Sequence, residues 1–194
     1  MRKLIASINL SLDGYLSRPD GELDWHTSNW STDMGEAMCR QLAAADTLLL
    51  GRVTYEAMAA YWQARAVSLS CSGDDPVLAD MLQRYVKVVV SRKLVKAPWN
   101  NSIIWSAAIP EKLRLLKEQG SRDIILYGSC SLLSTLLPAG LIDEYRLWIH
   151  PVAIGKGAAL FRSLGESRAL RLTGMERFNS GVVLLTYQKM PGDQ

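Results

Sequence analysis

Residues 47–58, TLLLGRVTYEAM, carry the pattern that decides the fold. The apolar run 48–50 ends at Gly51, and helix-forming residues follow directly. Apolar side chains then recur at the i, i+3, i+4 and i+7 spacing of a helix, at Tyr55, Met58, Ala59 and Trp62. A short buried strand, a glycine and the start of a helix are typical of one unit of an α/β sheet.

The turn between this strand and this helix is a candidate anion site. Gly51 would let the backbone approach a ligand closely. The first N–H groups of the helix have no partner within it, and Arg52 adds a positive charge. An ordinary strand-to-helix turn has the same sequence pattern, so this turn alone does not decide the function.

Two further stretches repeat the pattern and strengthen the prediction. The run 88–90, VVV, ends in Ser91-Arg92-Lys93, and the run 124–126, IIL, ends in Tyr127-Gly128-Ser129 before the helix-like CSLLSTLL. Open α/β sheets bind ligands at the carboxyl ends of their strands. We therefore expect these polar ends to converge on a phosphate-bearing cofactor.

Several segments together resemble the dihydrofolate reductase-like superfamily, and within it the reductase domain of bacterial riboflavin biosynthesis. They are KLIASINLSLDGYLS (3–17), LLLGRVTYEAM (48–58), KVVVSRKL (87–94), DIILYGSCSLLSTLLPAGLIDEYRLWIHPVAIGKGAALF (123–161) and a closing antiparallel pair. The resemblance implies a single α/β domain over residues 1–194, with one mixed, mostly parallel sheet, helices on both faces and a C-terminal antiparallel hairpin. It also implies an NADPH-dependent reductase that transfers hydride.

Composition agrees with such a domain and disfavours other classes. The chain of 194 residues has 48% hydrophobic and 21% charged residues, and its net charge of +3 does not form a basic run that would indicate a nucleic-acid partner. No apolar run approaches membrane-spanning length, and polar residues interrupt the N-terminal apolar run, so we expect no membrane span and no signal peptide. Three cysteines at unrelated spacings indicate a reducing cytoplasm and no metal site.

The resemblance also assigns residues to the substrate. The strand Lys3–Leu10 would line the nicotinamide pocket, and the S-L-D-G piece at 11–14 would lie beside nicotinamide and substrate. The expected substrate-binding residues are Ser7, Asn9, Asp13 and Trp25. Structural roles are equally consistent with the sequence: hydrogen bonds to loops for Ser7 and Asn9, an Asx turn for Asp13, and core packing for Trp25.

The expected NADPH-binding residues are Ala6, Gly51, Arg52, Thr54, Ser91, Arg92, Gly128, Ser129, Cys130 and Leu132. Arg52 and Arg92 are the candidates for the 2′-phosphate, although Arg92 is equally consistent with a solvated surface charge. In the family a strained cis peptide often joins the residues at the positions of Gly128 and Ser129. Cys130 stands where glycine is common, and we interpret it as an inert thiol.

The proton donor is not identified, and the candidates are Asp13 and Asp33. A helix is predicted over Ser31–Ala45, with Met34, Met38 and Leu42 on its apolar stripe. The folate-reducing branch carries a carboxylate on this helix near Asp33. The spacing from the preceding tryptophan does not agree and the LPADL-like context is missing, so we do not transfer that role. His26 is expected at the surface or in a turn.

The remaining segments complete the sheet. We predict a loop over Ala64–Asp75, helices over Pro76–Arg84 and Pro110–Gln119, and strands over Lys87–Ser91, Ser102–Trp105, Ile142–Val152, Leu170–Thr173 and Val182–Gln188. The strand Ile142–Val152 alternates, and its polar and aromatic face is a candidate contact with a second subunit, as in relatives that form homodimers.

The resemblance indicates a substrate of the 5-amino-6-(5-phosphoribosylamino)uracil type or another small carbonyl or imine compound. No H-x-E…P-C-x-x-C deaminase motif accompanies the reductase segments. The alternatives are a dihydrofolate or pterin reductase and a nucleotide-binding dimer without turnover. A nucleic-acid-binding protein is the weakest alternative.

Overall fold

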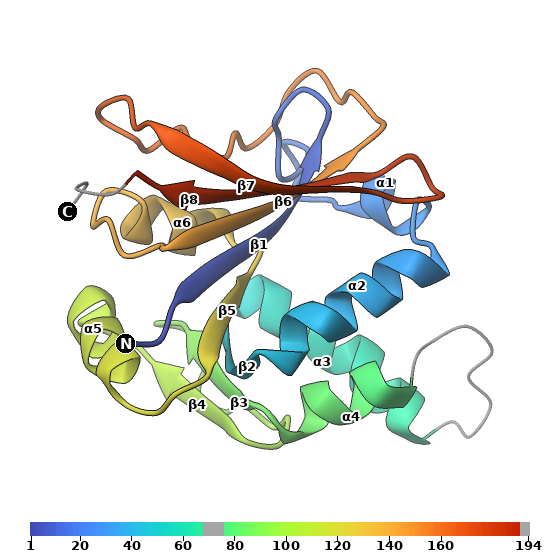
Figure 1. The fold of residues 1–194 in the computed structure, drawn as a ribbon. Coiled ribbons are helices and arrows are strands. Elements are labelled where there is room, and N and C mark those ends of the chain that lie inside the picture. The colour runs from blue at the N-terminus through green and yellow to red at the C-terminus, as the bar shows by residue number, and fades with distance from the viewer. Residues whose placement is uncertain (68–75, 191–194) are drawn as a thin grey trace.

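One mixed sheet of eight strands organises the computed structural model, which describes residues 1–67 and 76–190 (Figure 1). The strands lie in the order β4-β3-β2-β5-β1-β6-β8-β7. Their bounds are β1 Leu4–Ser11, β2 Ala45–Gly51, β3 Val86–Val90, β4 Ser102–Trp105, β5 Asp123–Tyr127, β6 Glu144–His150, β7 Leu170–Arg177 and β8 Val183–Lys189. The pairs from β4 through β6 are parallel, and β8 runs antiparallel to both β6 and β7, so the predicted fold class is confirmed.

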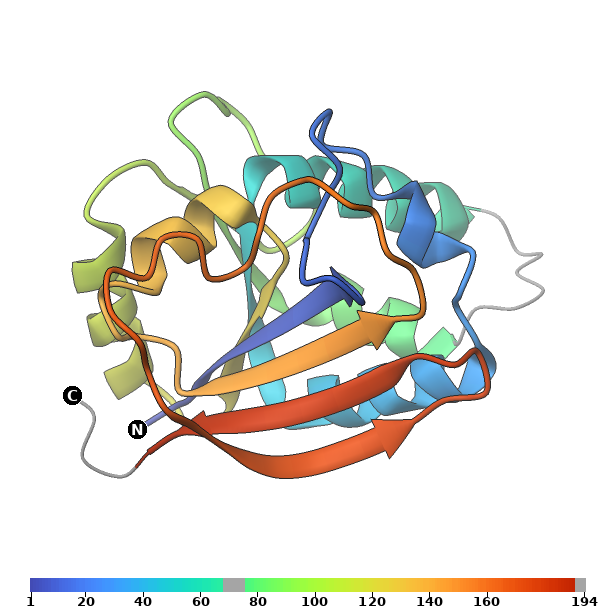
Figure 2. The same cartoon turned by 90° about the horizontal axis from the view of Figure 1, so that it is seen from above.

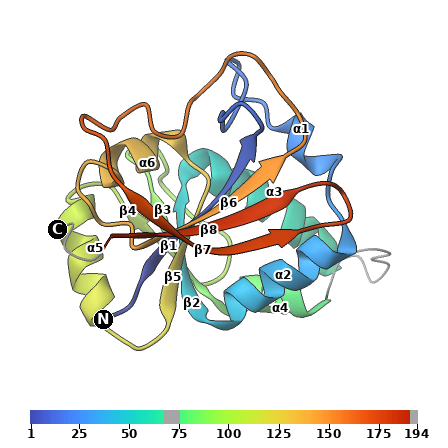
Figure 3. The same cartoon turned by 45° about the horizontal axis from the view of Figure 1, so that its top comes forward.

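Helices cover both faces of the sheet (Figures 1 and 3). Their bounds are α1 Asp24–Thr27, α2 Thr32–Ala43, α3 Arg52–Val67, α4 Pro76–Arg84, α5 Ile109–Glu118 and α6 Cys130–Leu136. Helices α2, α3 and α4 pack on one face, and α5 and α6 pack on the other. The short α1 lies beside the carboxyl ends of β1 and β6.

Strand alternation divides the core into two layers. Leu4, Ala6 and Ile8 of β1 pack in the layer that contains α5 and α6, whereas Ile5 packs in the layer of α2, α3 and α4. Strands buried on both faces read as continuous apolar runs, as in IIL at 124–126. For this reason, short apolar runs in which no polar residues alternate predicted the central strands correctly.

Several predicted boundaries are wrong. The helix predicted over Ser31–Ala45 ends at Ala43, because Ala45 already belongs to β2, and the strand predicted over Leu170–Thr173 continues to Arg177. The loop predicted from Ala64 does not start there, because α3 continues to Val67. The segment QARAV at 63–67 contains mostly residues of good helix propensity, which extend the helix beyond its apolar pattern. The rest of the predicted loop, over residues 68–75, lies outside the described residues. Helix α4 begins and ends at the predicted residues.

None of the helices seen in the described ranges combines the length and the apolar character that crossing a bilayer requires.

Candidate active site

The strand ends that the sequence singled out lie together at the carboxyl edge of the sheet. Gly51 pairs with Val90, so the end of β2 lies directly beside the end of β3 and the following Ser91. On the other side of β2, Leu50 pairs with Tyr127, the residue before Gly128. Strand β1 lies next, with Ser7 paired to Tyr127. Four adjacent parallel strands therefore bring the predicted residues to one edge.

The contact between Gly51 and Ser129 is closer than the sequence indicated. A Cβ atom on Gly51 would lie 2.1 Å from Ser129 Oγ and 2.7 Å from Ser129 Cβ. From the sequence, Gly51 was expected either to let a ligand approach the backbone closely or to form an ordinary strand-to-helix turn. In the structure, the Ser129 side chain fills the space above Gly51, so packing between the ends of β2 and β5 already requires a glycine there.

The turn that follows β5 has left-handed backbone at two successive residues. Gly128 has φ of 56° and Ser129 has φ of 68°. A Cβ atom at Gly128 would lie 3.2 Å from Thr54 Oγ1, which places Thr54 of α3 against this turn. The cis peptide that the resemblance implied is absent, because no peptide bond in the described segments is cis.

Helix α6 begins at this turn. Ser129 Oγ accepts a hydrogen bond from the Leu132 backbone N–H (3.4 Å) and caps the helix. Cys130 is exposed at the surface, but local desolvation of the sulfur raises the pKa of its thiol, which agrees with our interpretation of an inert thiol. The side chains of Leu132 and Ala6 are buried in the core, so these two predicted cofactor residues could face a ligand only through backbone atoms.

Arg52 and Ser91 have partners close in sequence, and Arg92 is exposed. Arg52 Nη1 donates to Glu56 Oε2 at 2.6 Å across one turn of α3, and both side chains are partly exposed. Ser91 Oγ accepts from the backbone N–H groups of Lys93 (3.0 Å) and Leu94 (2.9 Å), and so it shapes the turn after β3.

Ser7 belongs to a buried hydrogen-bonded chain. Trp148 Nε1 of β6 donates to Ser7 Oγ (3.0 Å), and Ser7 Oγ donates to Gln41 Oε1 of α2 (3.0 Å). The exposed fraction of each of these three residues is 5% or less. The hydroxyl that we predicted on the floor of the substrate pocket therefore links β1 to its neighbours.

Asn9 belongs to an aromatic and imidazole group at the end of β1. His150 Nε2 donates to Asn9 Oδ1 (3.0 Å), which leaves Nδ1 as an acceptor. The Trp25 ring of α1 packs edge-on against His150 with the ring centroids 5.3 Å apart, and His26 lies 6.0 Å away. Burial, and then the charge of His26, lowers the pKa of His150 to about 4, so His150 is neutral at pH 7.

This role of the two histidines was not predicted from the sequence. His26 was expected at the surface or in a turn, but it is partly buried in α1, and burial lowers its pKa. The polar and aromatic face of β6 was expected to meet a second subunit, and this expectation is wrong. Helix α2 of the same chain covers that face, where Trp148 stacks on Phe178 with the ring centroids 5.2 Å apart. The alternation in the sequence did place His150 on the same face as Trp148.

Both candidate proton donors hold loops in place. The Asp13 carboxylate accepts from the backbone N–H groups of Ile154 (3.2 Å) and Gly155 (2.7 Å), so it ties the loop after β1 to the loop after β6 (Figure 2). Asp33 accepts from the Ser31 hydroxyl (2.5 Å) and from the Asn179 N–H (2.9 Å) in the β7–β8 turn. Hydrogen bonds, first of all from Ser11 to Asp13 and from Ser31 to Asp33, lower the pKa of each carboxyl group.

Within the described ranges, no three His, Cys, Asp or Glu side chains come together as metal ligands.

Comparisons with known proteins identify relatives over almost the whole chain. The family model for the RibD C-terminal domain matches residues 2–184. A Bacillus subtilis (strain 168) protein, named uncharacterized protein YyaP, is 33% identical over 190 residues, which are 96% of this chain and 94% of that protein.

Two solved structures show the same fold at low identity. A Thermotoga maritima diaminohydroxyphosphoribosylaminopyrimidine deaminase/5-amino-6-(5-phosphoribosylamino)uracil reductase has a TM-score of 0.66 at 15% identity, and the match covers 97% of this chain and 57% of that one. A dihydrofolate reductase from Enterococcus faecalis, solved with NADP(H) and RAB-propyl, has a TM-score of 0.60 at 13% identity, with 96% of each chain covered.

Proposed function

Because the chain belongs to the RibD C-terminal domain family, we propose that it is an NADPH-dependent reductase. The observation that supports this most is the convergence of the ends of β2, β3 and β5 at one edge of the sheet. The proposed substrate is 5-amino-6-(5-phosphoribosylamino)uracil or a related small carbonyl or imine compound, since the Thermotoga relative is named for that reduction.

The residues at this edge fit a dinucleotide with a phosphorylated ribose. Helix α3 begins at Arg52 directly after β2, and its first turn contains no acidic residue. Its first N–H groups and the two guanidinium groups of Arg52 and Arg92 would hold phosphate oxygens. When bound there, NADPH supplies a hydride to the acceptor carbon of the substrate.

Where β1 and β6 reach the carboxyl edge of the sheet, two buried polar atoms could bind a substrate. Trp25 Nε1 and His150 Nδ1 are buried and have no hydrogen-bond partner in the described part of the chain. Buried polar atoms are normally paired, so these atoms fit a ligand that accepts from Trp25 and donates to His150. Because His150 is neutral at pH 7, its proposed role is to orient the substrate rather than to protonate it.

The ionised carboxylates of Asp13 and Asp33 favour a second candidate function, an NADPH-binding protein without turnover. Asp13 and Asp33 have lowered pKa values and accept hydrogen bonds from loop backbone, so both stay ionised at neutral pH. The same observation disfavours a dihydrofolate or pterin reductase that would use Asp33 as its acid, because Asp33 is engaged by the β7–β8 turn.

Steady-state NADPH oxidation separates these candidates. The purified protein would be assayed with the phosphoribosylaminouracil, with dihydrofolate and a dihydropterin, and with small aldehydes and imines, while NADPH affinity is measured by calorimetry. Turnover of the first compound or of an aldehyde or imine supports the proposal. Turnover of dihydrofolate alone indicates the pterin reductase, and tight NADPH binding without any turnover indicates the binding protein.

Arg52→Ala tests the proposed 2′-phosphate contact. A charge-assisted hydrogen bond contributes about 1.5–3 kcal/mol, so the variant should lose about that much affinity for NADPH and much less for NADH. Arg84→Ala is the matched control, because Arg84 forms the same kind of exposed ion pair, with Asp80 of α4. An equal loss for both cofactors would refute the 2′-phosphate role of Arg52.

We also propose that the enzyme is a cytoplasmic homodimer that pairs through β7. This strand lies at the outer end of the sheet, and its Leu172 and Met175 side chains are 50% and 74% exposed. An exposed edge strand offers backbone groups for pairing with a second copy. Light scattering during gel filtration tests this, and a monomer at micromolar concentration would reject it.

A further inference from the structure

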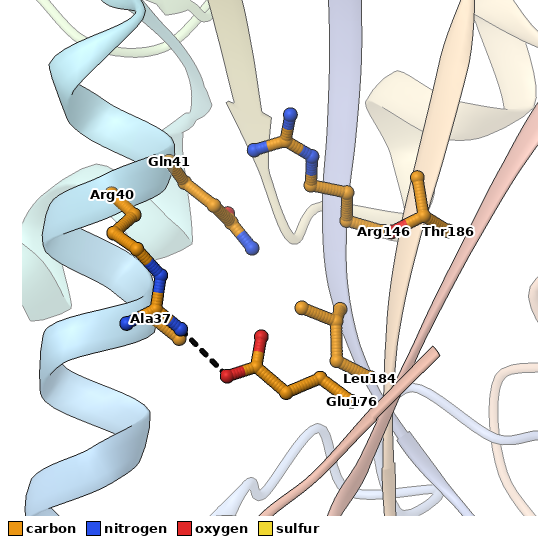
Figure 4. A pocket seen from close by; sticks show the side chains of 7 residues that line it. All are labelled: Ala37, Arg40, Gln41, Arg146, Glu176, Leu184 and Thr186. Carbon is orange, nitrogen blue, oxygen red and sulfur yellow. Dashed lines mark hydrogen bonds and ion pairs between the residues drawn. The ribbon is translucent and has the colours of Figure 1, made fainter. Parts of the chain in front are cut away.

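A cavity of about 250 Å³ lies between α2 and the antiparallel part of the sheet, apart from the candidate active site (Figure 4). Helix α2 contributes Ala37, Arg40 and Gln41, and the strands contribute Arg146, Glu176, Leu184 and Thr186. Ligand pockets for drug-sized molecules measure roughly 300–1,000 Å³, so a dinucleotide does not fit here. The cavity is large enough for a small organic molecule.

The side-chain amide of Gln41 supplies a buried hydrogen-bond donor to this cavity. Ser7 Oγ accepts from Trp148 Nε1, so the single hydroxyl proton of Ser7 is directed to Gln41 Oε1. The Gln41 oxygen therefore faces Ser7 and its NH₂ group faces the cavity (Figure 4). Gln41 is 5% exposed, and Nε2 is buried without a partner among the described residues. A buried amide N–H normally has an acceptor, and here a ligand would provide it.

Arg146 supplies a positively charged donor beside Gln41. Its Nε donates to Glu144 Oε1 at 2.7 Å, which fixes one edge of the guanidinium group. Glu144 is shared, because Gln188 donates to its other oxygen (3.0 Å) and Lys3 lies 3.6 Å from that oxygen. The Arg146 side chain is 19% exposed, and its terminal nitrogens are directed to the same space as the Gln41 amide (Figure 4).

The charges around the cavity select the kind of anion. Arg40 pairs with Glu176 at 2.6 Å, so these two side chains neutralise each other. Arg146 and Lys3 share the single carboxylate of Glu144, so this group keeps one net positive charge, and a singly charged anion at Arg146 would balance it. A guanidinium group binds a carboxylate through two parallel hydrogen bonds. Ala37 and Leu184 provide an apolar wall for a short alkyl chain.

We propose that this cavity is a binding site for a small monocarboxylate. The carboxylate accepts hydrogen bonds from the Arg146 guanidinium and the Gln41 amide, and the alkyl part lies against Ala37 and Leu184. This proposal does not depend on the reductase assignment, because it uses neither the turns proposed to hold phosphate nor the Trp25 and His150 atoms proposed to hold the substrate.

The test titrates the cofactor-free protein with sodium butyrate, butyramide and inorganic phosphate. The readouts are calorimetry and the indole N–H signals in a nitrogen–proton NMR spectrum. Butyrate should bind and shift the Trp148 indole signal, because that N–H is connected to Gln41 through Ser7. Butyramide has the same shape without charge and should not bind. An absence of butyrate binding, or a preference for phosphate over butyrate, would overturn the proposal.

Two variants check the assigned residues. Gln41→Glu places a carboxylate beside Arg146 and keeps an acceptor for Ser7, so it should fold and lose butyrate binding. Arg146→Ala should weaken butyrate binding about ten- to a hundredfold, the worth of a charge-assisted contact. Arg171→Ala, an exposed arginine of β7 outside the cavity lining, is the control and should bind like the wild type. Unchanged butyrate affinity in Gln41→Glu or Arg146→Ala would assign the binding to another site.

Discussion

Substitution of Gly51 by alanine tests the contact that joins the ends of β2 and β5. The new Cβ atom would lie 2.7 Å from Ser129 Cβ and 2.1 Å from Ser129 Oγ. Rotation about the Ser129 side chain can move Oγ, but the position of Cβ is fixed by the backbone. Carbon atoms pack at about 3.5–4.0 Å, so the two strand ends must separate by about 1 Å.

The expected loss of stability follows from two opposing effects. Overpacking of this kind typically costs about 1–3 kcal/mol. Alanine also restricts the unfolded chain, which returns about 0.4–1 kcal/mol. We therefore expect Gly51→Ala to lower the free energy of unfolding by about 1–2 kcal/mol. For a chain of this length, that loss corresponds to a decrease of about 2–8 °C in Tm.

The assay is urea unfolding of four proteins: wild type, Gly51→Ala, Ser129→Gly and the double variant. Ser129 has φ of 68°, a conformation that glycine adopts readily, and replacing a serine cap by glycine costs only about a few tenths of a kcal/mol. Ser129→Gly should therefore be nearly neutral, and in the double variant it should restore the stability that Gly51→Ala loses. Wild-type stability of Gly51→Ala, or a double variant as unstable as Gly51→Ala, would refute the reasoning.

Two further predictions concern side chains that link distant elements. Ser7→Ala leaves Trp148 Nε1 and Gln41 Oε1 buried without partners, so it should lower the free energy of unfolding by about 1–3 kcal/mol in urea titrations. The exposed Ser134→Ala serves as its control, and an equal effect of the two substitutions would contradict the role of Ser7. Hydrogen bonds from Ser31, Asn179 and Met34 hold the pKa of Asp33 below its ordinary value of 3.8 in the folded state. Asp33 therefore stabilises the fold above pH 3.8, and this contribution is lost as the pH falls through the folded-state pKa. The difference in unfolding free energy between wild type and Asp33→Asn should shrink below about pH 4, and a difference that stays constant from about pH 3 to 6 would contradict this.

The sequence predicted the fold well because the patterns that specify it are local. An apolar run that ends in Gly51 predicts β2 within a few residues, and a proline predicts the start of α4. The convergence of strand ends followed from a general property of parallel sheets, so the carboxyl edge could be predicted before any pairing was known. The end of α3 was missed because helix propensity extended the helix to Val67 beyond its apolar stripe.

The partners of the site side chains could not be predicted because they depend on strand register. Ser7 and Trp148 are 141 residues apart, and they meet only because Ser7 pairs with Arg146 and Asn9 with Trp148 in the parallel β1–β6 ladder. A shift of one residue would turn Trp148 to the other face of the sheet. Sequence reasoning identified Ser7 and Asn9 as polar residues in an apolar strand that need partners. It left those partners open between a ligand and neighbouring loops, whereas β6 supplies Trp148 for Ser7 and His150 for Asn9. Our proposal therefore pairs a substrate at this edge with Trp25 Nε1 and His150 Nδ1, which are buried and have no hydrogen-bond partner among the described residues, so that no hydrogen bond within the protein has to be displaced.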